Sequence, residues 1–420
     1  MQSTIREEEI KKGIIWNLLS YVFLGVFTLV SYVLITWKYG EDGLGAYSIV
    51  MSLFLIFGQL GVFGLQSAAM YYVPQQSDKK QLGQLLSSFL FVASIMGSVV
   101  GGIVYVGADW LGNCIFSSQS VAVGLKRLPM AIVFFSMNKT IASYINAQGK
   151  MVGFAILQSI RYFGIVASLG IILFLNGEYA LIFYAFILSE LLVFLVGILC
   201  ITRTTKIEFP KVYWMKHGVR FGKSAMLGNV VSDINTKVDV IMLGALCGDK
   251  EVGLYSFITI VVEGLLSILY VFRNNYNPLF STLIYQKKID EVKEVFIKLR
   301  KKLWLLFGIF SILILVGYNF FCKMFLQEEY MRSVLPAFII SVGCGVMAPY
   351  FVAGNLCTLK GKPAIDSLIT LCTIVCNCIL NYILISKYQI VGAAVATGLS
   401  YVFNSFLTGW MIRVKVWRSI

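Results

Sequence analysis

Long apolar segments recur along the whole chain, and this repetition restricts the fold more than any other feature. Hydrophobic residues make up 58% of the sequence and charged residues only 13%, a balance far from that of soluble domains. A helix of about 20 apolar residues crosses the hydrocarbon core of a bilayer. The chain is therefore predicted to be an all-α polytopic membrane protein. Its twelve expected transmembrane helices cover residues 13–37, 45–73, 83–106, 128–145, 152–175, 179–201, 219–243, 253–277, 303–321, 334–358, 364–386 and 390–412.

The sequence also contains an internal repeat. Residues 39–48 read YGEDGLGAYS and residues 247–256 read CGDKEVGLYS, so two glycines, a tyrosine and a serine recur at an offset of 208 residues. Farther along each half, QGK at 148–150 recurs as KGK at 360–362, at an offset of 212 residues. Two copies of one unit predict a seam between them, where transporters commonly place their substrate site.

Six expected spans in each half make the two repeats run parallel, because both halves then begin on the same side of the membrane. We expect two six-helix bundles around a central cavity. The predicted boundaries are 1–201 for the N-terminal bundle, 202–218 for a cytoplasmic connector and 219–420 for the C-terminal bundle.

Basic residues divide unevenly between the two sides of the predicted membrane topology. The odd-numbered loops hold only seven of the 35 Lys and Arg residues, and most of the others lie at the termini and in the even-numbered loops. Cytoplasmic loops collect Lys and Arg, so both termini are predicted to be cytoplasmic. The net charge of +14 follows from this topology and requires no nucleic-acid partner. The first span lacks a signal-peptide cleavage site and is expected to remain in the mature protein.

Residues 278–302 form the longest polar interval, and no interval is long enough for a separate soluble domain. Apolar residues at 289, 292, 295, 296 and 299 predict an amphipathic helix there. Such a helix either lies on the cytoplasmic membrane surface or serves as a solvated connector.

The residue pattern predicts neither a metal site nor a cofactor. Most of the nine cysteines lie within apolar spans, and His217 is the one histidine. A metal site requires more His, Cys or carboxylate ligands at ligand spacing. The sequence also lacks the G-x-x-x-x-G-K-[ST] phosphate loop, and it has no cytoplasmic domain or large outer loop to hold an enzymatic site. We therefore expect that the protein is not an enzyme and has no catalytic residues.

Three segments resemble the polysaccharide repeat-unit flippases, which export O-antigen and capsule precursors. Residues 381–402 read NYILISKYQIVGAAVATGLSYV, similar to a recurrent signature of that family, although its first glycine is replaced here. Residues 238–255 and 41–50 resemble the family's seventh span with its following loop, and the corresponding loop of the first half. This family belongs to a superfamily that includes multidrug and toxin extrusion transporters and the lipid II flippase.

The resemblance implies a substrate, a direction and a location. Family members move an undecaprenyl-pyrophosphate-linked oligosaccharide from the inner to the outer leaflet through a cavity that opens alternately to each side. The implied location is the inner membrane of a bacterium. Membrane lipid and a polysaccharide polymerase or ligase are the partners that this function suggests.

Basic residues inside the predicted spans are the candidates for binding the pyrophosphate. A charged residue at the centre of a membrane helix costs about 2.5–3.5 kcal/mol on insertion scales, so it is expected to face a wet cavity or another charge. Arg161, Arg273 and Lys139 lie within spans, and Arg and Lys bind phosphate oxygens. The alternative for Arg161 is a structural ion pair with Glu190, and the alternative for Arg273 is an interaction with a helix end.

Acidic residues inside the spans are candidates for coupling transport to a proton or sodium gradient. Asp233, Glu263 and Glu190 lie near the predicted middle of the membrane. Lys237 follows Asp233 by four residues on one predicted helix, which also allows a structural pair.

Sugars require amides, hydroxyls and aromatic faces. Asn17, Gln59, Gln66 and Asn274 are predicted to contact the oligosaccharide, and Asn274 corresponds to Gln66 under the 208-residue offset. A small-molecule exporter of the multidrug type on the same fold remains the alternative function, because the intramembrane acids would suit cationic substrates.

Overall fold

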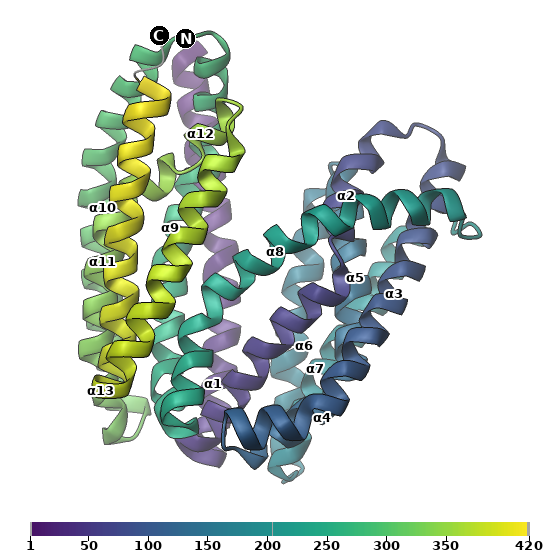
Figure 1. Ribbon diagram of the computed structural model, residues 1–420, viewed down its shortest axis with the longest axis vertical. Helices are drawn as coiled ribbons and strands as arrows, with labels where there is room; N and C mark the ends of the chain where they lie inside the picture. The colour runs from purple at the N-terminus through teal and green to yellow at the C-terminus, as the bar shows by residue number, and fades with distance from the viewer. Residues whose placement is uncertain (1, 204, 418–420) are drawn as a thin grey trace. The chain divides into compact units, whose positions relative to one another are not determined.

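The structure is a computed structural model that describes residues 2–203 and 205–417, with side chains omitted for residues 2–23, 151 and 363. The described residues form helices and turns without a β-strand (Figure 1). The helices are α1 (Gln2–Val62), α2 (Leu65–Tyr72), α3 (Lys79–Asp109), α4 (Gln119–Arg127), α5 (Pro129–Ala147), α6 (Met151–Phe174), α7 (Tyr184–Thr202), α8 (Val212–Cys247), α9 (Asp249–Tyr285), α10 (Ile289–Phe325), α11 (Val334–Ala353), α12 (Leu356–Leu359) and α13 (Pro363–Met411). Short 3-10 or π turns are η1 (Val73–Gln75), η2 (Trp110–Ile115), η3 (Tyr179–Phe183), η4 (Glu328–Ser333) and η5 (Ile412–Trp417).

The twelve predicted spans lie within these helices and turns to within a residue at their ends, but two of them are interrupted. Residues 63–64 separate α1 from α2 inside the span 45–73, and residues 354–355 separate α11 from α12 inside the span 334–358. By length and composition, eight helical stretches of the described chain are able to cross a membrane, and the bent pair of α4 and α5 gives a ninth. Two of the eight stretches hold two predicted spans each, because α1 continues through a break at Gly40 and α13 continues through a break at Gln389. The bent pair of α4 and α5 supplies the fourth span, and the more polar α8 supplies the seventh. The helices therefore account for the all-α fold with twelve spans.

The chain folds into two compact units. The first unit comprises Phe27–Gly253, and the second unit comprises Met1–Val26 together with Leu254–Ile420. In the first unit, α5 packs against α3 and α7, and α8 packs against α2 and α3. In the second unit, α11 packs against α10 and α13. The division into bundles at 1–201 and 219–420 remains a prediction.

Backbone conformation bears out the internal repeat. Gly40 and Gly248 have left-handed φ angles of 69° and 85°, and Gly149 and Gly361 have 77° and 80°. The residue after Gly149 and the residue after Gly361 each donate a backbone hydrogen bond to the carbonyl five residues earlier, at 3.2 and 2.9 Å. Glycine adopts this conformation without steric cost, and it closes a helix in this way. The two halves therefore use the same turns at equivalent positions.

The repeated glycine segments also cross each other in a reciprocal contact within the first unit. A Cβ atom on Gly45 would lie 1.8 Å from the carbonyl oxygen of Asp249, and one on Gly253 would lie 2.0 Å from that of Glu41. Under the 208-residue offset, Glu41 corresponds to Asp249 and Gly45 to Gly253. Lys250 adds an ion pair to Glu41 at 3.2 Å. Such mutual contacts are the signature of a local two-fold axis.

The amphipathic segment at residues 289–299 is the first part of α10 and continues directly into the ninth span. Its buried residues Val292, Phe296 and Leu299 join the apolar core of the second unit, together with Val352 of α11 and Val416 of η5. The predicted amphipathic helix is therefore present, but its apolar face packs against protein rather than against the membrane surface.

Candidate functional site

Four charged side chains from different helices gather inside the first unit. Lys139 lies on α5, Arg161 on α6, Glu190 on α7 and Asp233 on α8. Lys139 interacts electrostatically with each of the other three. We call these four residues the charge cluster. It unites two of the three predicted headgroup cations with two of the three predicted coupling acids.

Arg161 and Glu190 form a two-pronged ion pair at the centre of the charge cluster. The Arg161 Nε and Nη2 atoms lie 2.5 and 3.3 Å from the two carboxylate oxygens of Glu190. Arg161 Nη1 also donates to the side-chain oxygen of Gln158 at 3.1 Å. The side chains are only 12% and 2% exposed, so water screens this pair weakly. The structural ion pair with Glu190, which the sequence analysis gave as the alternative to headgroup binding by Arg161, is thus present.

The local sequence explains why these two residues meet. Gly164 on α6 faces Ser189 on α7, and a Cβ atom on Gly164 would lie 3.2 Å from the Cα atom of Ser189. Ser189 Oγ donates to the backbone carbonyl of Arg161 at 2.6 Å. Small residues allow two membrane helices to approach closely, and this approach places Arg161 beside Glu190.

Asn138 also holds the Glu190 carboxylate, and it donates to the same oxygen, Oε2, as Arg161 Nη2 does. Its Nδ2 atom lies 2.7 Å from both the Oε2 atom and the backbone carbonyl of Glu190. Asn138 is fully buried, and its Oδ1 atom has no hydrogen-bond partner. A buried carboxylate needs several donors, and Arg161 and Asn138 supply them.

Phe135 lies beneath both cations of the charge cluster. The Lys139 amine lies 5.6 Å and the Arg161 guanidinium 5.1 Å from the centroid of its ring. Within the described part of the chain, Lys139 forms no ion pair with a carboxylate. The half-buried Lys139 amine is therefore the cation of the cluster with the most capacity for a further anion.

Asp233 is half-buried and interacts electrostatically with Lys139 and with Lys237, one turn farther along α8. The predicted structural pair of Asp233 with Lys237 stays a prediction. Asp233 on α8 also interacts with Lys139 on α5. The linear sequence did not reveal this interaction.

The remaining predicted cation, Arg273, belongs to the second unit and lies beside two aromatic rings that contact each other. Its guanidinium is 4.7 Å from the ring centroid of Tyr270 on α9 and 4.6 Å from that of Phe351 on α11. The two rings meet edge to face at 4.9 Å. Aromatic faces attract a guanidinium and restrict its orientation.

The other predicted residues occupy varied environments. Gln59 is 1% exposed, and its Nε2 atom has no hydrogen-bond partner. Gln66 is half-buried, whereas Glu263 and Asn274 are exposed. The side chain of Asn17 lies outside the part of the chain that the structure describes. Their predicted contacts with sugar and, for Glu263, with a coupling ion remain predictions.

Sequence reasoning missed three residues that shape the charge cluster: Phe135, Asn138 and Gln158. Two of them carried a signal, because Phe135 precedes Lys139 by four residues and Gln158 precedes Arg161 by three. Side chains at these spacings lie on one face of a helix. Asn138 gave no such signal, since its partner is on another helix.

The described residues contain no group of three or more His, Cys, Asp and Glu side chains placed to hold a metal ion. The charge cluster contains two acids, one of which already binds Arg161 and Asn138. Its two cations and two acids are groups that a charged solute is able to contact.

Twelve apolar helices in two repeats, with ionisable residues held inside the bundle, define a multi-span membrane transporter. The chain belongs to the polysaccharide biosynthesis protein family, which matches residues 10–283, and the MatE family matches residues 225–383. Both place it in the multidrug/oligosaccharidyl-lipid/polysaccharide exporter superfamily. The chain is 22% identical over 416 residues to a putative O-antigen transporter of Shigella flexneri, with 95% of this chain and 97% of that protein covered.

Solved structures of the superfamily share the fold. The lipid II flippase MurJ in an inward closed conformation matches with a TM-score of 0.75 at 17% identity, over 95% of this chain and 87% of that one. An inward-facing multidrug resistance MATE family transporter matches with a TM-score of 0.76 at 11% identity, over 93% and 94% of the two chains. At these identities, the likeness concerns the fold.

Proposed function

We propose that the protein flips an undecaprenyl-pyrophosphate-linked oligosaccharide from the inner to the outer leaflet by alternating access. The observation that carries this proposal is the charge cluster, which holds two cations inside the bundle of a polysaccharide biosynthesis family member. The relative described as a putative O-antigen transporter supports a glycan precursor as the cargo. The protein would act in the inner membrane of a bacterium, with both termini in the cytoplasm.

The pyrophosphate would bind Lys139 and Arg161. A guanidinium has five N–H donors, and Arg161 uses three of them on Glu190 and Gln158. Two donors stay available for phosphate oxygens, and Glu190 fixes the plane in which they point. Lys139 adds a point charge that no carboxylate neutralises by direct contact. The predicted contact of Arg273 with the pyrophosphate stays a prediction for the second unit.

Release of the headgroup would be coupled to an ion through Asp233. In the empty cluster, the charge of Lys139 stabilises the Asp233 carboxylate. A phosphate on Lys139 would compete for that charge, and Asp233 would then favour binding a proton or a sodium ion. Glu263 is the second candidate, whereas Glu190 is engaged by Arg161 and Asn138 and would act mainly by positioning them. The predicted amide contacts of Asn17, Gln59, Gln66 and Asn274 would hold the sugars.

The experiment is a translocation assay with purified protein in proteoliposomes. A fluorescent undecaprenyl-pyrophosphate glycan is the substrate, and a quencher confined to one leaflet reports its movement. We expect Lys139→Gln to reduce the rate at least tenfold, because the variant keeps the size and polarity of the residue but removes its charge. Lys126→Gln is the matched control, since this lysine pairs with Asp109 outside the cluster. Full transport by Lys139→Gln at normal abundance would contradict the proposed headgroup site.

A multidrug exporter is the second candidate, favoured by the MATE structures and by the half-buried Asp233. Cationic dyes run in the same proteoliposomes discriminate between the two candidates. Dye efflux without glycan movement, abolished by Asp233→Asn, would replace the flippase assignment. A polymerase or ligase partner would be sought by crosslinking to the loops that are predicted to be cytoplasmic.

A further inference from the structure

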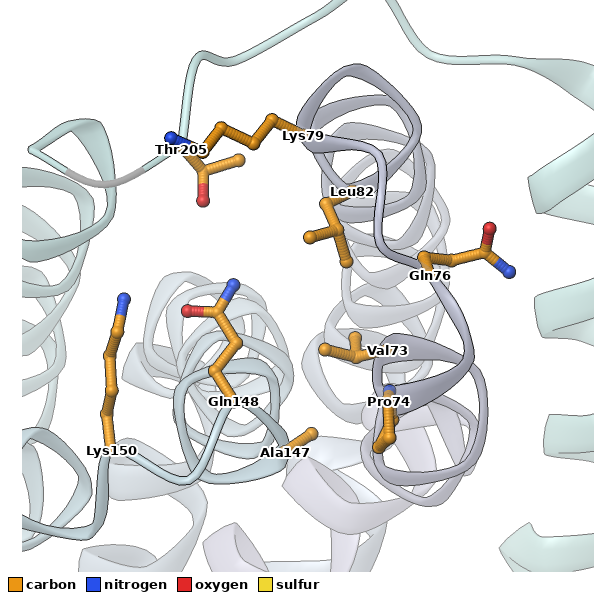
Figure 2. A pocket seen from close by; sticks show the side chains of 9 residues that line it. All are labelled: Val73, Pro74, Gln76, Lys79, Leu82, Ala147, Gln148, Lys150 and Thr205. Atoms are coloured by element: carbon orange, nitrogen blue, oxygen red, sulfur yellow. The ribbon is translucent and has the colours of Figure 1, made fainter.

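A pocket of about 370 Å³ opens in the first unit, away from the charge cluster (Figure 2). Its floor is apolar and includes Val73 and Pro74 of η1. Polar side chains form the rim: Figure 2 shows Gln148 and Lys150 extending from the turn after α5, and Lys79 extending from the start of α3 toward Thr205. The pocket thus combines an apolar base with a polar, basic entrance.

The charges around this pocket are unbalanced. Lys79 and Lys150 line it, and none of its lining residues is acidic. Neither lysine forms an ion pair in the described part of the chain. The nearest acid along the chain, Asp78, accepts a hydrogen bond from the backbone amide of Lys80 at 3.0 Å and caps α3. The pocket therefore offers two ammonium groups and the side-chain amide of Gln148 to an anionic ligand, whereas the amide of Gln76 points away from it (Figure 2).

The corresponding residues of the second unit contact their own chain. Under the 212-residue offset, Gln148 corresponds to Lys360, and Thr205 corresponds to Trp417. Lys360 Nζ donates to the backbone carbonyl of Val416 at 2.9 Å. Trp417 packs at 5.9 Å against the ring of Phe296 in the apolar core. A small Thr205 in the first unit leaves open the kind of space that a tryptophan occupies in the second.

We propose that this pocket binds the phosphate headgroup of an anionic phospholipid. The pocket is formed by loops that the distribution of Lys and Arg places on the cytoplasmic side, where basic pockets between membrane helices bind anionic headgroups. Lys79 and Lys150 bind the phosphate, Gln148 binds the polar headgroup, and Val73 and Pro74 contact the first carbons of the acyl chains. The site is separate from the charge cluster and independent of the transported substrate.

The experiment measures lipid binding to the full-length protein in detergent by native mass spectrometry. Phosphatidylglycerol is titrated against the wild type and against the double variant Lys79→Gln/Lys150→Gln. We expect the variant to bind about thirtyfold more weakly, the effect of two lysines near a membrane surface. The charge-conserving variant Lys79→Arg/Lys150→Arg is expected to bind nearly as the wild type does.

The matched control is Lys301→Gln/Lys362→Gln, which removes two exposed lysines of the second unit, one of them equivalent to Lys150. Equal losses in both glutamine double variants would overturn the proposal, because the effect would then reflect net charge alone. Undiminished binding by Lys79→Gln/Lys150→Gln would overturn it as well. If millimolar inorganic phosphate displaces the lipid, the pocket would be reassigned to a soluble anion. If phosphatidylcholine binds as tightly as phosphatidylglycerol, a charge-selective site would be excluded.

Discussion

The ion pair of Arg161 and Glu190 makes one prediction that separates a structural role from a functional one. Glu190→Gln keeps the shape of the side chain and its bond from Asn138, but leaves the Arg161 charge buried without a counter-ion. Two opposite charges about 4 Å apart attract each other by about 4 kcal/mol at an effective dielectric constant of about 20. Breaking a buried pair in this way generally costs about 3–5 kcal/mol. We expect the free energy of unfolding to fall by that amount.

The measurement is unfolding of the purified protein in mixed detergent micelles, combined with the glycan translocation assay. The double variant Arg161→Met/Glu190→Gln removes both charges and is expected to regain stability to within about 1–2 kcal/mol of the wild type, since no uncompensated charge remains. The transport rate of this double variant is expected to stay low, because the proposed headgroup site has lost the guanidinium of Arg161. Glu294→Gln is the control, as it breaks an exposed pair with Lys298 and is expected to leave stability unchanged.

Two results would refute this reasoning. Wild-type stability of Glu190→Gln would mean that the pair is not a buried ion pair of the folded protein. Full transport by the stable double variant would mean that Arg161 only supports the structure, and the proposed headgroup site of the first unit would then rest on Lys139.

Three further predictions concern the glycine crossing, a helix cap and the second unit. Gly45→Ala places a Cβ atom 1.8 Å from the carbonyl oxygen of Asp249 and is expected to destabilise the protein by about 1–3 kcal/mol in thermal unfolding. Gly102→Ala, with nothing within 4 Å, is expected to be neutral or stabilising, and equal effects of the two would contradict the crossing. Ser118→Ala removes the N-cap of α4 and a hydrogen bond of 2.5 Å to Asp249, and its expected cost in the same assay is about 1 kcal/mol. Arg273→Lys keeps the charge but loses the planar contact with two aromatic rings, so we expect an apparent KM for the glycan raised several-fold; an unchanged KM would assign Arg273 a structural role.

The fold was predictable to a large extent because a bilayer imposes strong rules on the sequence. Every backbone polar group must be satisfied inside the membrane, so a long apolar run becomes a helix. The repeat at residues 39–48 and 247–256 was likewise visible, since a left-handed turn and a close helix crossing both require glycine. The apolar face of α10 was predicted as well, although the sequence did not reveal whether lipid or protein covers it.

The site was predictable only in part. Charges at Lys139, Arg161, Glu190 and Asp233 stand out in apolar spans because burying them without partners is costly. Which of them meet depends on the packing of α5 to α8, and that packing depends on small contacts such as Gly164 against Ser189. Asn138, which holds Glu190, lies in no pattern that distinguishes it from other polar residues of a helix.

The sequence by itself therefore determined the membrane class, the twelve helices, the repeat and the set of residues whose charge needs a partner. These properties follow from local periodicity, composition and the low polarity of the bilayer. Only the tertiary structure decided that Arg161 pairs with Glu190, that Phe135 underlies two cations and that Lys79 and Lys150 line one pocket of the first unit. Those outcomes depend on side-chain contacts between helices far apart in the chain, and hydrophobicity along a single helix carries no information about them.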